Sequence, residues 1–297
     1  MVLFLQLVIW FGWIAPALRH FGIAPVLQSL DATLLAVCTL LITAAGYVIN
    51  DIYDVGVDAV NKPEKRIVNK EISLDSAIHF YYALVVVGAL IAAFLAWRIG
   101  HFLYFLIYVL FSIKLWFYSH SLQKRPLTGN LLVALLSAIF PLFYLLAEEP
   151  ALRQLGRQYP DEMFRVIGVL LVFSGFAFLV SWSRELIKDI EDIAGDKVAG
   201  FLTLPIVAGV EKTVRFVVVI MALTAVLVLL WGGVVGTYWS IGMGVVIFIL
   251  LGATGYKSMK CSEKACFHTI SLYLKGIMLL GMVFLCLHIL MYGYVLK

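Results

Sequence analysis

Long apolar stretches, each about 20 residues in length, recur along nearly the whole of this 297-residue chain. A helix needs about 20 mostly apolar residues to cross the hydrocarbon core of a bilayer. Only short breaks that contain charged residues, Gly or Pro separate the stretches. They predict nine membrane-spanning helices, at approximately 1–18, 32–52, 78–97, 101–119, 127–147, 163–187, 211–231, 234–255 and 270–294. We therefore expect an all-α, polytopic membrane bundle.

The composition excludes an ordinary soluble domain, because 63% of the residues are hydrophobic and 13% are charged. The net charge of +4 is spread over many loops, so no basic arm is available for nucleic acid. The first stretch lacks the basic segment of a signal peptide, and we interpret it as the first membrane helix. The four cysteines form no CxxC pair, so we expect packing roles rather than disulfides or a zinc site for Cys38, Cys261, Cys266 and Cys286.

The basic residues of the loops predict how the chain is oriented. The connections after the second, fourth, sixth and eighth spans are richer in Lys and Arg than the opposite connections, with Lys62, Lys65, Arg66, Lys70, Lys124, Arg125, Lys188, Lys197, Lys212, Lys257, Lys260 and Lys264. By the positive-inside rule these connections are cytoplasmic, which places the N-terminus inside and the C-terminus outside. We expect a multi-pass protein of the cell (inner) membrane.

Two acidic segments lie at the cytoplasmic ends of predicted spans, where charges are costly and indicate function. They are residues 47–58 (YVINDIYDVGVD) and 188–196 (KDIEDIAGD). Aspartates recur in both at intervals of three and then four, as Asp51, Asp54 and Asp58 and as Asp189, Asp192 and Asp196. Positions i, i+3 and i+7 share one stripe of a helix, so each segment should direct three carboxylates the same way. Glu191 lies off that stripe and is expected to face solvent.

The shared spacing indicates an internal duplication, because one constant offset relates the two segments and pairs the second span with the sixth. We expect a single transmembrane domain over residues 1–297, with a first repeat at about 1–119, a second at about 127–255 and an extra helix at 270–294. Repeats of this kind commonly place a shared site at their interface. A solvated helix cap would explain one such motif, but not two with the same spacing on the same side of the membrane.

Three anions on one helix face repel each other and require a cation. Mg²⁺ prefers hard oxygen ligands and takes one or two carboxylates, with water and phosphate oxygens in its other positions. Two facing clusters would hold a diphosphate between them through Mg²⁺. The candidate catalytic and metal-binding residues are therefore Asp51, Asp54, Asp58, Asp192 and Asp196.

A diphosphate also needs cationic or amide donors, because metal alone does not neutralise every oxygen of the leaving group. Candidates for substrate binding on the same side of the membrane are Asn50, Lys62, Arg66, Lys124, Arg125, Arg184, Lys188 and Asp189. Three tyrosines, Tyr47, Tyr53 and Tyr118, are expected close by.

Asn50-Asp51-x-x-Asp54-x-x-x-Asp58 and Asp192-x-x-x-Asp196 resemble the two aspartate signatures of UbiA-type intramembrane prenyltransferases. The resemblance covers nearly the whole chain. It implies about nine helices, Mg²⁺ as cofactor, a prenyl diphosphate as donor, and cytoplasmic loops that cap a central cavity above a lateral opening to the bilayer. The chain departs from the family at its start, because no Arg precedes Arg19 to match the family's Arg-x-x-Asn element on the first helix.

Within that family, four segments resemble the branch that makes digeranylgeranylglyceryl phosphate: residues 61–66 (NKPEKR), 129–130 (GN), 184–196 (RELIKDIEDIAGD) and 203–206 (TLPI). This likeness implies geranylgeranyl diphosphate as donor and geranylgeranylglyceryl phosphate as lipophilic acceptor, in membrane lipid biosynthesis. The allylic C–O bond would ionise while metal and basic residues stabilise the diphosphate and an apolar cavity excludes water. Two alternatives stay open, namely an aromatic acceptor such as 4-hydroxybenzoate and a secondary transporter.

Overall fold

A computed structural model describes residues 2–64, 66–235 and 237–292. Met1 of the first predicted span, Lys65, Gly236 of the predicted span 234–255, and the end of the predicted last span at 293–294 lie outside these ranges. Within them, nine helical runs are long and apolar enough to cross a membrane: Val2–His20, Ser29–Tyr53, Leu74–Ile99, Leu103–Leu122, Thr128–Ala147, Pro160–Val198, Val210–Gly233, Tyr238–Met259 and Lys264–Met291. The prediction of an all-α membrane bundle is confirmed, and each predicted span overlaps one of these runs.

Several of the spans are composite. The first joins α1 (Val2–Leu7), a π-helical segment η1 (Val8–Ile14) and α2 (Ala15–His20). The fourth joins α6 (Leu103–Phe117) to η2 (Tyr118–Leu122), and the fifth joins α7 (Thr128–Ile139), the 3₁₀ turn η3 (Phe140–Leu142) and α8 (Phe143–Ala147). The other spans are α3 (Ser29–Tyr53), α5 (Leu74–Ile99), α10 (Pro160–Val198), α12 (Val210–Val235), α13 (Tyr238–Met259) and α14 (Lys264–Tyr292). Three short helices, α4 (Val55–Asn61), α9 (Glu149–Gln158) and α11 (Leu204–Ala208), lie at the ends of the bundle.

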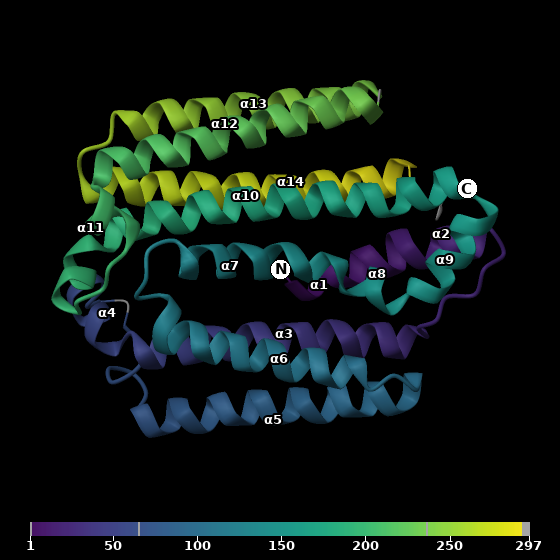
Figure 1. The fold of residues 1–297 in the computed structure, drawn as a ribbon, viewed down its shortest axis with the longest axis horizontal. Coiled ribbons are helices and arrows are strands. Elements are labelled where there is room, and N and C mark those ends of the chain that lie inside the picture. The colour runs from purple at the N-terminus through teal and green to yellow at the C-terminus, as the bar shows by residue number, and fades with distance from the viewer. Residues whose placement is uncertain (1, 65, 236, 293–297) are drawn as a thin grey trace.

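The long helices run roughly side by side, so that the connections gather at two opposite ends (Figure 1). α7 lies between α10 on one side and the pair α3 and α6 on the other, while α12 and α13 form one outer edge and α5 the other (Figure 1). The short helices α4 and α11 are at the same end of the bundle (Figure 1). Both acidic segments therefore lie at one end, as their sequence positions predicted.

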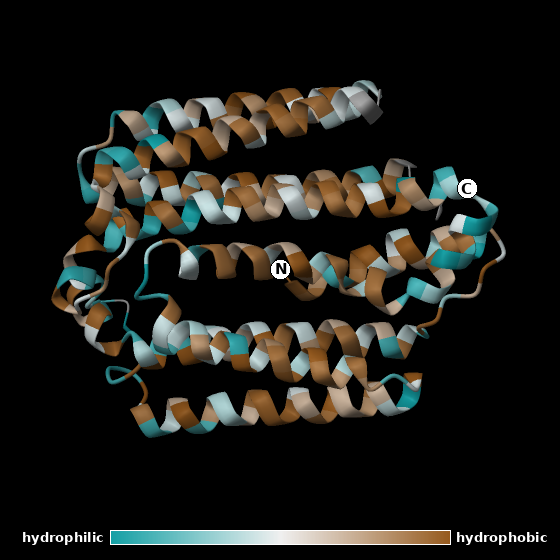
Figure 2. Cartoon of the chain, viewed as in Figure 1, coloured by the Kyte–Doolittle hydropathy of each residue, from teal (hydrophilic) through white to brown (hydrophobic). Residues whose placement is uncertain are grey.

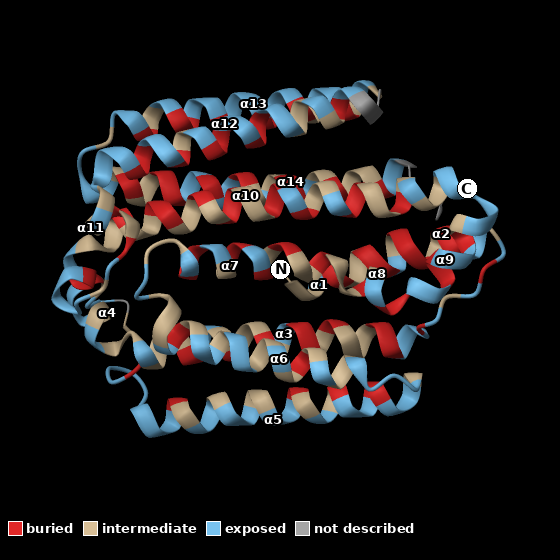
Figure 3. Ribbon diagram, viewed as in Figure 1, coloured by how far each residue is buried: buried red, intermediate tan, exposed pale blue. Residues whose placement is uncertain are grey.

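Lipid is the solvent for the sides of the bundle. Apolar residues cover the middle of the helices, and hydrophilic residues concentrate toward the two ends (Figure 2). The outer helices are largely exposed along their length (Figure 3), with Leu90 66% and Trp97 79% exposed on α5. Exposed side chains of this kind are stable in a bilayer and would not be in water.

The most buried core lies at the end opposite the acidic segments, where the first span packs against α8, α9 and α10. It contains Trp10, Trp13 and Tyr144, all fully buried. Glu148 is also fully buried, and its carboxylate accepts hydrogen bonds from Trp10 Nε1 (2.9 Å) and from the backbone N–H groups of Val26 (2.6 Å) and Leu27 (3.1 Å). Because three hydrogen bonds compensate for the burial of the Glu148 carboxylate, we interpret it as a structural residue. Its bonds to Val26 and Leu27 hold the loop between α2 and α3 in place.

Two helix boundaries near the acidic segments differ from the prediction. α10 continues to Val198, eleven residues beyond the expected end at 187, so the whole second aspartate segment is helical. α3 ends at Tyr53, and Asp54, with φ −89° and ψ 4°, joins it to α4. The first aspartate segment is thus divided between two helices, with Asp51 before the junction and Asp58 after it.

The expectation that no cysteine is in a disulfide was wrong for one pair. Cys261 and Cys266 form a disulfide across the connection between α13 and α14, with a Cα–Cα distance of 5.6 Å. Their spacing lacks the CxxC signature, and a turn in the connection brings them together. Cys38 is buried and Cys286 is partly buried, in agreement with packing roles.

Candidate active site

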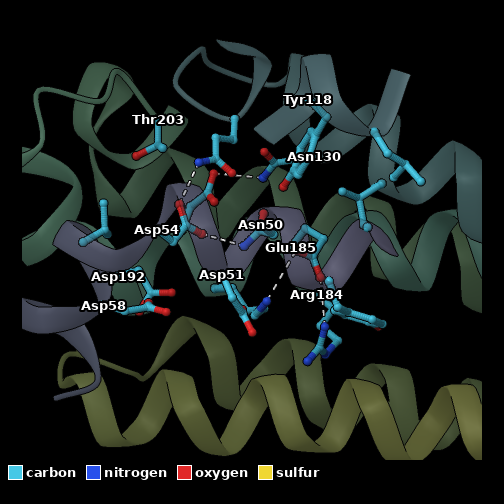
Figure 4. Close-up of a pocket in the computed structure, with 18 of the residues that line it drawn as sticks. Asn50, Asp51, Asp54, Asp58, Tyr118, Asn130, Arg184, Glu185, Asp192 and Thr203 are labelled. Carbon is cyan, nitrogen blue, oxygen red and sulfur yellow. Dashed lines mark hydrogen bonds and ion pairs between the residues drawn. The ribbon is translucent and has the colours of Figure 1, made fainter. Parts of the chain in front are cut away.

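A cavity of about 390 Å³ opens at the end of the bundle that carries both acidic segments. Side chains from α3, α4, α6, η2, α7, η3, α10 and the connections after α3, α4, η2 and α10 line it (Figure 4). All six aspartates of the two segments are among them: Asp51, Asp54, Asp58, Asp189, Asp192 and Asp196. Segments separated by more than 130 residues in the sequence therefore contribute carboxylates to one site.

The cavity has a strongly polar part and a more apolar part. The aspartates surround the part near α4, whereas apolar residues (Gly46, Leu115, Leu136 and Phe140) line the part between the long helices together with the polar Thr43, Ser137, Arg184 and Glu185. The apolar side chains of the second part suit a hydrocarbon chain, and the first part has the lining expected for a charged group. A ligand with a charged head and an apolar tail fits this arrangement.

The three aspartates of α10 each have a different environment. Asp189 accepts a hydrogen bond from Asn130 Nδ2 of α7 (2.8 Å), and Asp196, 6% exposed, accepts one from Thr203 Oγ1 (3.4 Å). Asp192 Oδ2 pairs with Lys62 Nζ at 3.2 Å. The other oxygen, Asp192 Oδ1, is buried and has no hydrogen-bond partner. A buried carboxylate oxygen without a partner is unfavourable unless a cation or donor completes it.

Asp54 is the central carboxylate of the first segment. It accepts hydrogen bonds from Gln123 Nε2 (2.7 Å) and Asn50 Nδ2 (2.6 Å). Burial raises the pKa of Asp54 to about 6, although these two hydrogen bonds lower it. Burial likewise raises the pKa of Asp58, with Lys62 acting in the opposite direction. The ionised form of this cluster is therefore costly in the absence of a bound cation.

Asn61 and Lys62, at the C-terminal end of α4, hold the first segment against the second. The Asn61 side chain donates to the carbonyl of Asp192 (2.9 Å) and accepts from the backbone N–H of Gly195 (2.8 Å). Lys62 lies 3.2 Å from Asp192 and 4.0 Å from Asp58, so one ammonium group bridges the two clusters. Lys264 of α14 donates to the Asn61 carbonyl (3.1 Å) and closes the junction.

Gly195 is required at this junction by the close approach of α4. A Cβ atom on residue 195 would lie 2.5 Å from Asn61 Nδ2 and 2.8 Å from Asn61 Oδ1. We expect Gly195→Ala to lower the free energy of unfolding by about 1–3 kcal/mol, because it breaks two buried hydrogen bonds. Thermal unfolding in detergent measures the change, and Gly175→Ala on the same helix is the matched control because no atom lies within 4 Å of its Cβ. Equal melting temperatures for the two variants would contradict this role.

Of the predicted substrate-binding residues, five line the cavity and three do not. Asn50, Lys62, Arg184, Lys188 and Asp189 line it. Arg66 donates instead to the carbonyl of Asn69 (3.4 Å), Lys124 lies over the ring of Phe201 (5.8 Å), and Arg125 is exposed. Tyr47 and Tyr118 line the cavity, while Tyr53 packs against His120 outside it.

Sequence reasoning missed several polar residues of the site. Gln123, Asn130 and Thr203 bond to aspartates, and Glu185 lines the cavity, yet none was given a role. Asn130 and Thr203 stood in segments that resembled the family, which was the available signal. Gln123 lies beside the basic residues Lys124 and Arg125 after a membrane span, in no segment that resembled the family, and carries no such signal.

The expectation that Glu191 faces solvent was wrong. Its side chain is 10% exposed, and its carboxylate lies 2.9 Å from His268 Nδ1 of α14. Because α14 packs against this side of α10, a position off the aspartate stripe faces a neighbouring helix rather than water.

The charges of the cavity fit a divalent cation bound together with a substrate. Seven carboxyl groups line it, from Glu185 and the six aspartates, against three basic side chains, from Lys62, Arg184 and Lys188. In the part of the chain that the structure describes, no three acidic, His or Cys side chains converge closely enough to hold a metal by themselves. Mg²⁺ needs only one or two carboxylates when water and phosphate oxygens complete its shell. The unpartnered Asp192 Oδ1 and the facing carboxylates suit that role.

Comparison with known proteins gives one consistent result. A family model described as the UbiA prenyltransferase family matches residues 7–274. A digeranylgeranylglyceryl phosphate synthase from Methanosphaera stadtmanae is 31% identical over 255 residues, which cover 84% of this chain and 84% of that protein. A solved structure concerning digeranylgeranylglyceryl phosphate synthase in membranes has a TM-score of 0.65 at 23% identity, over 97% of this chain and 94% of that chain. A UbiA homologue from Archaeoglobus fulgidus bound to DMAPP and Mg²⁺ has a TM-score of 0.55 at 18% identity, over 96% of this chain and 98% of that chain.

Proposed function

The chain belongs to the UbiA prenyltransferase family, and we propose that it transfers a geranylgeranyl group from geranylgeranyl diphosphate to geranylgeranylglyceryl phosphate. The acceptor follows from the relatives, since a protein that is 31% identical over 84% of both chains is a digeranylgeranylglyceryl phosphate synthase. The cofactor is Mg²⁺, which accompanies DMAPP in a UbiA homologue of the same fold.

The main support for the proposal is that both aspartate segments line a single cavity, which apolar side chains of the membrane spans also line. The carboxylates of Asp51, Asp54, Asp58, Asp192 and Asp196 would hold Mg²⁺ on the diphosphate. When bound, Mg²⁺ supplies positive charge that stabilises the diphosphate leaving group. The part of the cavity between the long helices would take the geranylgeranyl chain of the donor.

The chain's own residues position the reacting groups and exclude water. Lys62, held between Asp58 and Asp192, donates to diphosphate oxygens and keeps the two clusters at a fixed separation. Asn50 and Gln123 hold the Asp54 carboxylate in one orientation. The allylic C–O bond breaks and the diphosphate leaves with the bonding electrons. The acceptor hydroxyl oxygen then bonds to the allylic carbon to form the ether, and its proton passes to the diphosphate or to water. The buried apolar lining keeps water from the allylic cation during this step.

We place the site on the cytoplasmic side of the membrane and the N-terminus inside the cell. The end of the bundle with α4 and α11 carries the basic connections, which supports this orientation through the positive-inside rule. Mg²⁺ and the polar diphosphate group of the donor would reach the site from that side. The acceptor, which is a lipid, would enter from the bilayer.

A transfer assay with radiolabelled geranylgeranyl diphosphate tests the proposal. Purified protein is incubated with geranylgeranylglyceryl phosphate or with 4-hydroxybenzoate, with and without Mg²⁺. We expect labelled lipid product from the first acceptor only, and only with Mg²⁺. Product from 4-hydroxybenzoate alone would contradict the proposed acceptor, and no transfer to either would contradict the function.

The affinity for Mg²⁺ is expected to fall as the pH is lowered through about 6. Burial raises the pKa of Asp54 to about 6, so below that pH a proton occupies the carboxylate that the metal requires. For one competing proton, the apparent affinity falls about tenfold for each pH unit below that pKa. Titration of Mg²⁺ into the protein with a non-hydrolysable geranylgeranyl diphosphate analogue, at a series of pH values and monitored by calorimetry, measures the effect. Constant affinity across this range would show that Asp54 does not bind the metal.

A further inference from the structure

Two basic side chains in the cavity, Arg184 and Lys188, pair with Glu185 rather than with an aspartate. Arg184 and Lys188 are one turn apart on α10, and both pair with Glu185: Arg184 Nη1 at 2.8 Å and Lys188 Nζ at 3.6 Å from its carboxylate oxygens. One carboxylate therefore faces two cations. Arg184 Nε is buried and has no hydrogen-bond partner, so one edge of the guanidinium is unused. A buried donor without a partner is unfavourable, and an arginine inside a membrane helix indicates function.

Arg184 lies further from the diphosphate site along α10 than Lys188 does, and Lys188 is close enough to act electrostatically on Asp58. At 1.5 Å per residue, Lys188 lies about 6 Å and Arg184 about 12 Å from Asp192 along the helix axis, toward the middle of the bundle. Figure 4 shows Arg184 and Glu185 on the far side of Asp51 from Asp58 and Asp192. Along α10, Arg184 and Lys188 therefore come before Asp192 and Asp196, the carboxylates that would bind the metal and the donor.

The pair also lies at one edge of the acidic face. At 100° per residue, one sector of α10 about 60° wide holds four acidic residues: Glu185, Asp189, Asp192 and Asp196. Lys188 and Arg184 lie beside that sector, on the side of Glu191, whose carboxylate contacts α14. Asn130 of α7 bonds to Asp189 on the other side. An anion placed beside the pair would thus avoid the metal-binding carboxylates.

We propose that Arg184 and Lys188 form the subsite for the phosphate group of the acceptor lipid. The inference rests on the proposed function, in which the acceptor is a glyceryl phosphate with a phosphate monoester on the carbon next to its reacting hydroxyl. That anion is repelled by the acidic lining of the cavity and requires its own cationic site close to the donor. Arg184 with its free Nε edge and Lys188 with its ammonium group provide charge-assisted donors of the kind that bind phosphate.

Kinetics with a phosphorylated and a dephosphorylated acceptor test the subsite. The wild-type protein, Arg184→Gln, Lys188→Met and the charge-retaining Arg184→Lys are compared with geranylgeranylglyceryl phosphate and with geranylgeranylglycerol. We expect the wild type to prefer the phosphorylated acceptor, and Arg184→Gln and Lys188→Met each to reduce that preference in kcat/KM about 10- to 100-fold. Arg184→Lys should retain part of the preference, and Arg184→Gln should change the KM for geranylgeranyl diphosphate less than the KM for the phosphorylated acceptor. Lys197→Met, on an exposed position of the same helix, is the matched control.

Each other outcome overturns the inference in a distinct way. Variants that keep the preference but raise the KM for geranylgeranyl diphosphate would assign the pair to the donor. A wild type that uses both acceptors equally would show that no phosphate is recognised, while leaving prenyl transfer itself intact. A wild type that transfers to neither acceptor would overturn the proposed function together with the subsite.

Discussion

Asp192→Asn is expected to lower kcat/KM for prenyl transfer about 1,000-fold, which corresponds to about 4 kcal/mol of transition-state stabilisation. The substitution keeps the size of the side chain and removes its charge. Asp192 has one oxygen paired with Lys62 and a second, buried oxygen without any partner, so it is the carboxylate best prepared to bind a metal. Steady-state kinetics with geranylgeranyl diphosphate and geranylgeranylglyceryl phosphate measure the loss.

The control for this variant is Asp75→Asn. Asp75 is exposed in the first turn of α5, outside the cavity, and its substitution should change kcat/KM less than about threefold. Thermal unfolding of both variants separates a loss of activity from a loss of fold. An Asp192→Asn protein with nearly wild-type kinetics would exclude this residue as a metal ligand.

Removal of divalent cations is expected to abolish transfer, with a rate reduction of at least about 10,000-fold. The cavity presents seven carboxyl groups and three basic side chains, so a diphosphate without metal would meet net repulsion. Transfer by protein treated with EDTA, followed by addition of Mg²⁺, measures the dependence. The melting temperature should change little, because the core around Trp10, Trp13 and Glu148 is at the other end of the bundle.

Activity that survives metal removal would contradict the expected reaction. Elemental analysis of the treated protein confirms that no metal is left. Addition of Mg²⁺ should restore the original rate, and failure of this recovery with an intact melting transition would show that another cation is required.

The long apolar segments made the nine spans predictable from the sequence, because membrane crossing depends on length and hydropathy alone. The end of α10 was not predictable in this way. Its last eleven residues include Lys188, Glu191 and Asp196, and a hydropathy pattern interprets such charges as the end of a span. They stay helical because they face the cavity and α14.

The bend at Asp54 had no marker in the sequence. The backbone N–H of Asp54 donates to Asn50 and its carbonyl accepts from Asp58, so the helix turns without losing these hydrogen bonds. No Pro is needed for such a junction. At this junction the Asp54 carboxylate also accepts hydrogen bonds from the side chains of Gln123 and Asn50. The bond from Gln123 forms only when the chain has folded, because Gln123 is far from Asp54 in the sequence.

The aspartates were predictable because their spacing is repeated, whereas their partners were not. Asn130, Gln123 and Thr203 reach the site from other helices and connections. Asn130 and Thr203 lie in segments that resemble the family, but their hydrogen bonds to aspartates follow no local spacing, and Gln123 lies in no such segment. The Cys261–Cys266 disulfide depends on a turn that the spacing alone does not reveal. The division into two four-helix repeats, with an extra last helix, stays a prediction.

The most direct test of the account is a double-mutant cycle between the two clusters. The dissociation constant of a non-hydrolysable geranylgeranyl diphosphate analogue is measured with Mg²⁺ for the wild type, Asp54→Asn, Asp192→Asn and the double variant. If both clusters hold one metal-bound diphosphate, each single substitution should remove most of the binding energy and the double substitution little more, with a coupling of at least about 1 kcal/mol. Losses that simply add would contradict a shared site.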